Sequence, residues 1–289
     1  MRPEVPDLTL LPPSTMPACW VLSGMDGAVS LRFDAKTGLE EGTGSDALCV
    51  DTGQPLLEGV GADILSLGHA TRLQKGCLEC LENDSFLIGM AQLPADANNI
   101  EEQSYRIYRA IIETTGERSL YRIWNYVPGI NHEAPGMMEN YKLFCSGRVR
   151  AFAEHYGDED TAHFPSASAT GSGNGLLTVV FLAGFPTATH WENPDQVPAY
   201  KYPQKYGPRS PAFARASRFT DPDGGEWVMV AGTAAIKGSE TLYPGDFARQ
   251  LPVTFDNLNL MLGQVGMQLN GQGVTRRRHV KVFLRNRKN

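Results

Sequence analysis

The chain has 289 residues, of which 42% are hydrophobic and 20% are charged, a composition typical of globular proteins and not of disordered chains. The longest apolar run, residues 176–185, is far shorter than the ~20 residues of a membrane span. Acids and prolines stand where a signal peptide would carry its apolar core. We therefore expect a cytoplasmic location without membrane contact. The net charge of −6 argues against a nucleic-acid partner, because such proteins carry a basic surplus.

The N-terminal half predicts strands and helices in alternation. Residues 1 to about 60 are rich in Gly, Pro and Asp and predict short strands and loops. An apolar run at 86–91 predicts a strand, and helical spacing of apolar residues predicts a helix over 101–115. Alternation over 120–126 predicts a second strand, and residues 137–155 predict a second helix.

The second half repeats this mixture. The polar, small-residue stretch 165–175 predicts a separating loop, and residues 176–183 predict a buried strand. Strands are expected at 212–219 and 227–232, joined by a turn at 221–225, and a last strand at 279–284. Asp246 is the expected N-cap of a helix, which Pro252 should delay or bend. The order of elements predicts an α+β protein of two similar halves.

Two familiar kinds of site are not supported. The glycines of residues 169–175 run into a strand and not into a helix whose N-terminus could bind a phosphate. They therefore predict a turn, and the alternative is a stretch of backbone that approaches a ligand closely. Cys77 and Cys80 form a close pair, but no second pair or spaced histidines complete a zinc site. We therefore predict no metal and no cofactor.

Basic residues in the second half indicate a site for an anion. Tyr206, Arg209 and Arg215 surround rigid proline turns and the strand that follows, and arginine is the side chain best shaped to hold a carboxylate. Lys281 and Arg285 occupy alternate positions of the predicted last strand and could face the same anion. The alternative for this basic segment is a solvated chain end.

Several motifs in the same order resemble the chorismatases. They are residues 123–131, 141–148, 192–209, 213–216, 231–236 and 281–285. The resemblance implies an α+β fold of two YjgF/RidA-like units, each a mixed β-sheet backed by helices, with a threefold assembly. The units would be residues 1–165, with an irregular N-terminal extension, and residues 166–289, shortened at the C-terminus.

The resemblance also implies a reaction, the removal of pyruvate from the enolpyruvyl ether of chorismate. The product would be a dihydroxycyclohexadiene carboxylate or 3-hydroxybenzoate. Chorismate carries two carboxylates, so we expect Tyr206 and Arg209 to hold one, and Lys281 with Arg285 or Arg215 to hold the other. Gly232 and Thr233 are also expected to bind substrate. Cleaving the ether requires a proton on the enol methylene, which a carboxyl with a raised pKa can supply.

The sequence departs from the family pattern in two places. The family's proton donor is a glutamate in a strand beyond the segment that matches Lys281 to Arg285, and this sequence ends at Asn289. Ser239 stands where the family has a histidine, and the neighbouring Glu240 is the nearest remaining candidate for the catalytic acid. Gly232 matches the glycine of hydroxybenzoate-forming members. A non-catalytic dicarboxylate-binding protein and a RidA-like imine hydrolase are the alternatives.

Overall fold

The computed structural model describes residues 9–10, 28–32, 48–58, 62–134, 138–158, 160–267 and 279–285. These residues form an α+β structure, and no helix among them is long and apolar enough to cross a bilayer. The strands and α-helices, with two short 3₁₀ turns at Ala199–Lys201 and Gln204–Tyr206, are β1 (Thr9–Leu10), β2 (Ala28–Arg32), β3 (Leu48–Asp51), β4 (Ala62–Ser66), β5 (Thr71–Lys75), β6 (Leu78–Glu82), β7 (Phe86–Pro94), α1 (Ile100–Thr115), β8 (Ser119–Pro128), β9 (Glu133–Ala134), β10 (Met138–Glu139), α2 (Asn140–Tyr156), β11 (Ser166–Ser172), β12 (Leu176–Gly184), β13 (Thr189–Trp191), β14 (Ala216–Thr220), β15 (Glu226–Val230), β16 (Ile236–Lys237), β17 (Glu240–Thr241) and α3 (Phe247–Gln264).

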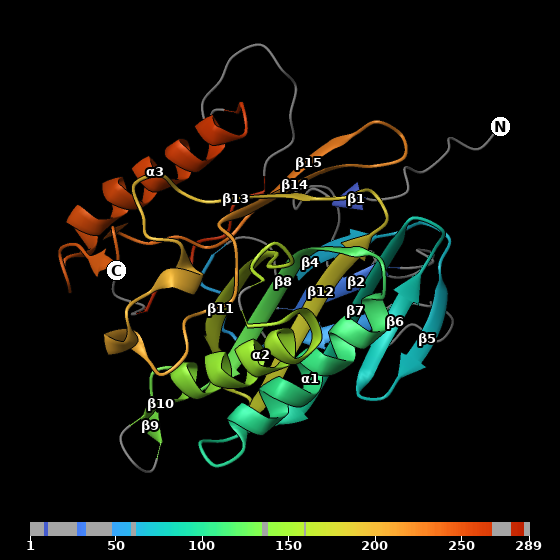
Figure 1. The fold of residues 1–289 in the computed structure, drawn as a ribbon, viewed down its shortest axis with the longest axis horizontal. Coiled ribbons are helices and arrows are strands. Elements are labelled where there is room, and N and C mark those ends of the chain that lie inside the picture. The colour runs from blue at the N-terminus through green and yellow to red at the C-terminus, as the bar shows by residue number, and fades with distance from the viewer. Residues whose placement is uncertain are drawn as a thin grey trace.

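A mixed six-stranded sheet is the centre of the fold. Its strand order is β11-β8-β12-β7-β6-β5, with β11 parallel to β8 and the other pairs antiparallel. Helices α1 and α2 cover one face (Figure 1). The four-stranded sheet β1-β4-β2-β3 packs on the opposite face through apolar side chains of β2, β3 and β4. The six-stranded sheet is therefore enclosed on both faces.

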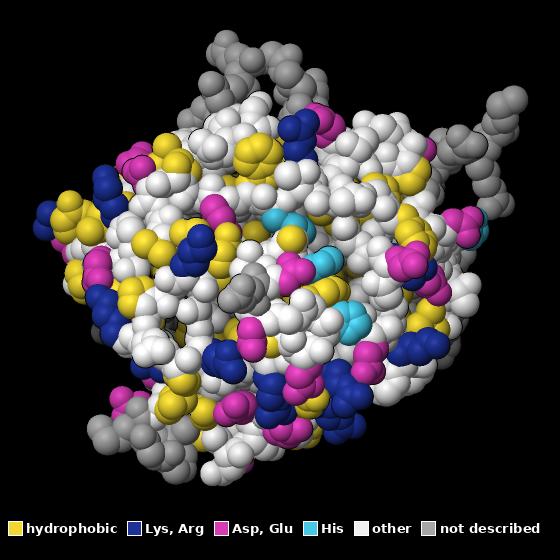
Figure 2. Space-filling view, in the orientation of Figure 1, with side chains coloured by type: hydrophobic (Ala, Val, Ile, Leu, Met, Phe, Trp, Pro, Cys, Tyr) yellow, Lys and Arg dark blue, Asp and Glu magenta, His cyan; other side chains and the backbone are white. Residues whose placement is uncertain are grey.

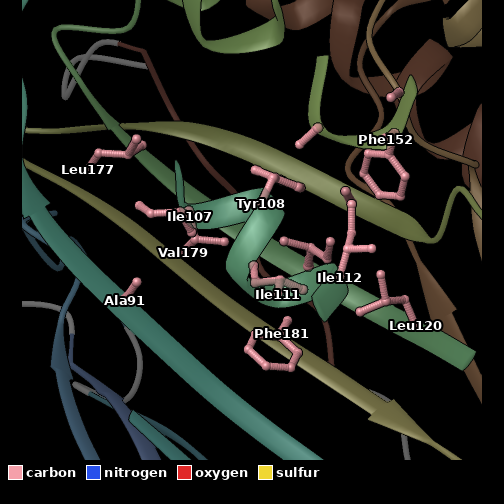
Figure 3. Packing of buried hydrophobic residues seen from close by; sticks show 14 of the residues in the cluster. Ala91, Ile107, Tyr108, Ile111, Ile112, Leu120, Phe152, Leu177, Val179 and Phe181 are labelled. Atoms are coloured by element: carbon pink, nitrogen blue, oxygen red, sulfur yellow. The ribbon is translucent and has the colours of Figure 1, made fainter. Parts of the chain in front are cut away.

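The sequence of β12 explains why both faces are enclosed. Val179 and Phe181 pack among the helices, whereas Val180 and Leu182 pack against the smaller sheet. Because side chains alternate across a strand, a continuous apolar run supplies both layers at once. Figure 3 shows Val179 and Phe181 among the residues of α1. The predicted strand at 176–183 is thus confirmed, as are the strands at 86–91 and 120–126.

The two helices cross in very close contact. A Cβ atom on Gly147 of α2 would lie 2.0 Å from the carbonyl oxygen of Glu101 in α1. The hydroxyl of Ser104 donates a hydrogen bond of 2.8 Å to the carbonyl of Phe144, which ties the helices at the same level. Only glycine allows this approach of the two backbones. Both helices lie where the sequence predicts them.

A second region follows β12. Strands β13, β14 and β15 form a three-stranded antiparallel sheet, and the predicted turn joins β14 to β15. This sheet is connected to the edge of the larger one, because Ser166 of β11 forms a bridge with Ala214 and its amide donates to the hydroxyl of Ser217 at 2.8 Å. The two regions therefore share a continuous hydrogen-bonded seam.

Two sequence predictions differ from the structure. Residues 166–172, predicted as part of a loop, form β11, because small polar residues fit an edge position beside β8. Residues 279–284, predicted as a strand, form none. Asp246 caps α3 as predicted, and the helix begins at Phe247, so of the two effects expected of Pro252 the delayed start is excluded. The unit boundary at 165/166 stays a prediction; β8 before it and β11 after it are neighbours in one sheet.

Candidate active site

A small pocket lies between α2 and the loop before β14. It is lined in part by Tyr141, Cys145, Tyr202, Tyr206 and Arg209. Its free volume is about 10 Å³, which is room for one water molecule and far less than the ~300–1,000 Å³ of small-molecule sites. The structure thus brings together Tyr206 and Arg209, as the sequence predicts. Arg209 is half exposed and also lies 3.4 Å from Asp158.

Arg215 lies behind this pocket and is only 5% exposed. Its Nη2 donates a hydrogen bond of 2.9 Å to the hydroxyl of Tyr202, which lines the pocket. Its Nε has no hydrogen-bond partner and lies 4.0 Å from a carboxylate oxygen of Glu192. A buried guanidinium with an unused donor can hold a carboxylate in a bidentate manner, provided that one reaches it.

Glu192 is the carboxyl group next to Arg215. Its side chain is 22% exposed, and neither carboxylate oxygen has a hydrogen-bond partner. Burial raises the pKa of this carboxyl to about 7, although the charge of Arg215 lowers it in part. A carboxyl with this pKa is protonated in about half of the molecules at neutral pH. It therefore has the property that a general acid requires.

A second buried arginine, Arg148 of α2, lies on the same side of the sheet. It is 1% exposed, and its guanidinium lies 5.8 Å from the ring centroid of Phe213, which also contacts Arg215 at 5.1 Å. Burial raises the pKa of the Tyr141 hydroxyl, and the charges of both arginines lower it. Tyr141 thus lies within the field of two cations at the pocket wall. The buried part of the site holds the guanidinium groups of Arg148 and Arg215 and the carboxyl of Glu192.

Glu240, predicted as the catalytic acid, has different surroundings. Its side chain is 63% exposed and forms an ion pair with Lys205. The hydrogen bond from Lys205 lowers the pKa of the Glu240 carboxyl. These surroundings favour the ionised form, whereas a proton donor must hold its proton near neutral pH. The catalytic role of Glu240 stays a prediction that its environment does not favour.

Gly232 and Thr233 lie directly after β15. The amide of Ala231 donates to the carbonyl of Arg215 at 2.7 Å, which places Gly232 beside the buried arginine. A Cβ atom on Gly232 would lie 3.7 Å from the Cβ of Ser168 on β11. The hydroxyl of Thr233 accepts a hydrogen bond of 3.4 Å from Gln196. Both residues are therefore close to the seam between the regions.

Lys281 and Arg285 are not brought to the pocket. Lys281 and His279 each form an ion pair with Asp63 of β4, in the smaller sheet. Arg285 is exposed on a segment without regular structure. No strand forms over 279–284, so the expected alternate strand positions are wrong, and the binding of an anion by Lys281 and Arg285 stays a prediction.

Glu192 and Arg148 lie within two of the motif stretches, but nothing in the sequence indicated a role for either of them in the site. Glu192 belongs to a polar, proline-rich stretch, and Arg148 lies in a helix among apolar residues. The only available signal for Arg148 is a charge at a position where the helical period predicts the core. No sequence pattern predicts that Glu192 is buried, because its burial depends on the conformation of a loop.

The described part of the chain holds no group of three His, Cys, Asp or Glu side chains placed to bind a metal ion. On the face seen in Figure 2, basic and acidic side chains are interspersed, and neither sign dominates. No patch of one sign marks an anion site on this face.

Comparison with known proteins agrees with the motifs in the sequence. Residues 65–183 match the family described as Chorismatase FkbO/Hyg5-like, N-terminal. A solved structure of a chorismatase aligns over 91% of this chain and 81% of its own, with a TM-score of 0.74 and 26% identity. In sequence and in fold the chain is similar to the chorismatases. The structural match extends well beyond the residues of the family model.

Curated relatives carry corresponding names. A 3-hydroxybenzoate synthase of Streptomyces hygroscopicus is 38% identical over 184 residues, which are 61% of this chain and 53% of the relative. A chorismatase of the same organism is 35% identical over 214 residues, 71% of this chain and 60% of the relative. A chorismatase of Streptomyces rapamycinicus is 34% identical over 212 residues, 70% and 62% of the two chains. The chain therefore spans less than two thirds of the length of these relatives.

Proposed function

We propose that this protein removes pyruvate from chorismate by protonating its enolpyruvyl ether. The observation that carries the proposal is the buried pair of Arg215 and Glu192. The arginine can hold a substrate carboxylate, and the carboxyl can carry a proton at neutral pH. The names of the curated relatives, chorismatase and 3-hydroxybenzoate synthase, support the choice of substrate.

Glu192 and the residues that bind the carboxylate have separate parts in the proposed reaction. The proton of Glu192 goes to the methylene carbon of the enol ether, whose π electrons form the new C–H bond. Protonation produces an oxocarbenium ion. Either water adds to its cationic carbon and the bond from that carbon to the ether oxygen then breaks, leaving the oxygen on the ring as a hydroxyl, or a ring hydroxyl attacks the ring carbon and the ether oxygen leaves as the keto oxygen of pyruvate. In both routes pyruvate is released, and the proton that the attacking oxygen loses returns to the Glu192 carboxylate. Arg215, with Arg209 and Tyr206 at the pocket, holds the carboxylate that fixes the methylene near the acid.

The product depends on what attacks the cation. By the resemblance of its motif, Gly232 corresponds to the glycine of hydroxybenzoate-forming chorismatases, and a Cβ atom added there would meet only the Cβ of Ser168, at 3.7 Å. We therefore propose 3-hydroxybenzoate as the product, with the dihydroxycyclohexadiene carboxylate as the competing outcome. Chromatography of the reaction mixture against both compounds distinguishes them.

The first experiment measures pyruvate release from chorismate, coupled to lactate dehydrogenase. It uses this chain and a chain extended to the next in-frame stop codon of the gene. Turnover by this chain supports a proton donor within residues 1–289. Turnover by the extended chain alone assigns the donor to the added residues. Turnover by neither chain, with chorismate still bound, refutes the proposed activity and leaves a dicarboxylate-binding protein.

We also propose that the fold consists of two YjgF/RidA-like units that assemble as a trimer. The six-stranded sheet with α1 and α2 would be the first unit, and β13 to α3 would belong to the second. The junction then lies after β12 and not at residue 165. Light scattering should give three times the chain mass of 31.6 kDa, and a monomeric mass would refute the assembly.

A further inference from the structure

Residues 202–210 form a small loop whose two ends meet. The hydroxyl of Ser210 donates a hydrogen bond of 2.8 Å to the carbonyl of Tyr202, which closes the loop at its base. The Tyr202 hydroxyl accepts a hydrogen bond of 2.9 Å from the buried Arg215, so the base is the fixed end of the loop. Within the described ranges, the backbone hydrogen bonds of residues 203–210 join members of the loop to one another, and none of these residues is buried. The loop can therefore move as a compact unit without breaking either sheet.

This loop forms one wall of the pocket beside α2. Tyr206 and Arg209 line that wall, and Tyr141 and Cys145 of α2 line the opposite one. The free volume between the walls is about 10 Å³, so a ligand larger than a water molecule does not fit while the loop lies in this position. Cys145 is only 1% exposed. With the loop in this position, the α2 wall is closed to a substrate.

Two exposed ion pairs hold the loop on its outer side. Arg209 lies 3.4 Å from Asp158, just beyond the end of α2, and Lys205 pairs with Glu240 of β17. All four side chains are more than half exposed. Ion pairs of this kind contribute little to stability, and dissolved salt screens them. The closed position of the loop is therefore held by weak contacts, whereas its base is held by buried ones.

We propose that residues 202–210 are a lid on this pocket, that its ion pairs with Asp158 and Glu240 latch it in the closed position, and that it opens about its base to admit a ligand. Tyr206 and Arg209 move with the lid, so they reach a ligand only when the lid closes over it. The motion of the lid is independent of what the ligand is. The identity of the ligand as chorismate rests on the proposed function.

Labelling of Cys145 with N-ethylmaleimide measures the opening, because this thiol lies on the α2 wall of the pocket. Burial raises the pKa of the Cys145 thiol, which makes it unreactive while the lid is closed. The variant Asp158→Asn/Glu240→Gln removes both latches, and its Cys145 should react about 3- to 10-fold faster than that of the wild type. Peptide mapping by mass spectrometry gives the rate at each cysteine. Salt at about 0.5 M should accelerate the labelling of the wild type and leave that of the variant unchanged, because it screens the same ion pairs.

Two controls separate opening of the lid from unfolding. Cys80 is buried on β6 and does not line the pocket, so it should stay unlabelled in every chain. Glu113→Gln removes the exposed ion pair with Arg109 on α1 and should leave the labelling of Cys145 unchanged. Equal rates at Cys145 in the wild type and the latch variant would overturn the lid, as would a rise in the labelling of Cys80 that matches the rise at Cys145.

Addition of chorismate connects the lid to the proposed function. A ligand held by Tyr206 and Arg209 keeps the lid closed, so chorismate should slow the labelling of Cys145 in the wild type. Faster labelling of the latch variant without protection by chorismate would keep the lid and refute the proposed substrate. Protection by chorismate with equal rates in the two chains would keep the substrate and refute the latches.

Discussion

The region up to β12 and the region after it are stabilised in different ways. In the first, apolar runs fill both faces of the six-stranded sheet, and the two helices touch backbone to backbone at Gly147. In the second, β13 to β15 are short, and buried polar residues such as Asn193, Arg215 and Asn257 organise the loops. The first region is therefore held by apolar packing and forms the stable frame of the fold. The second carries the buried side chains to which we assign the proposed chemistry.

The largest expected effect concerns the second region. Glu192→Gln removes the proposed proton while keeping the size of the side chain. Pyruvate release should fall by ~10²–10⁴, the usual contribution of a general acid. The coupled assay checks this, with chorismate affinity measured on the same sample. A variant that binds normally and still turns over at the wild-type rate would remove Glu192 from the mechanism.

The same residue should make stability depend on pH. The pKa of Glu192 is raised from 4.5 to about 7, so its contribution is fully present below pH 4.5 and is lost as the pH rises through 7. The difference in unfolding free energy between Glu192→Gln and wild type should grow by about 3 kcal/mol in favour of glutamine between pH 4.5 and pH 8. Urea unfolding at several pH values measures it. A constant difference would contradict the raised pKa.

A smaller effect tests the first region. Gly147→Ala places a Cβ where only 2.0 Å is available, so α1 and α2 must separate. Overpacking of this kind costs about 1–3 kcal/mol of unfolding free energy. Gly263→Ala in α3 is the matched control, since no atom lies within 4 Å of its added Cβ. It should gain about 0.5–1 kcal/mol from helix propensity. Equal effects of both changes would disprove the close contact.

The smallest effect is expected at Glu240. It is exposed, and surface ion pairs such as the one with Lys205 contribute little. Glu240→Gln should leave pyruvate release within about twofold of wild type. The assay is the same as for Glu192, and a loss comparable with that of Glu192→Gln would return Glu240 to the role that the sequence suggested.

These differences also explain what the sequence could predict. Strands 86–91 and 176–183 and both helices of the first region follow from periodicity, because burying an apolar face fixes them. Strand β11 was missed, since its small polar residues gain their order from β8 and not from their own pattern. Of the predicted ligands, Tyr206, Arg209 and Arg215 lie at or directly behind the pocket. The positions of Glu192 and Lys281 depend on contacts between distant segments, which spacing along one chain does not encode.

The buried arginines have a consequence for the speed of substrate capture. The chain carries a formal charge of −6, so at long range a doubly negative ligand approaches a molecule of its own sign. Attraction begins only at the entrance to the site, where water is excluded and the guanidinium groups are no longer screened. Added salt, which shortens the range of repulsion to about 10 Å at 0.1 M, should therefore accelerate association before it weakens the bound state. If the proposed dicarboxylate is the ligand, its capture depends on short-range recognition and gains nothing from electrostatic steering.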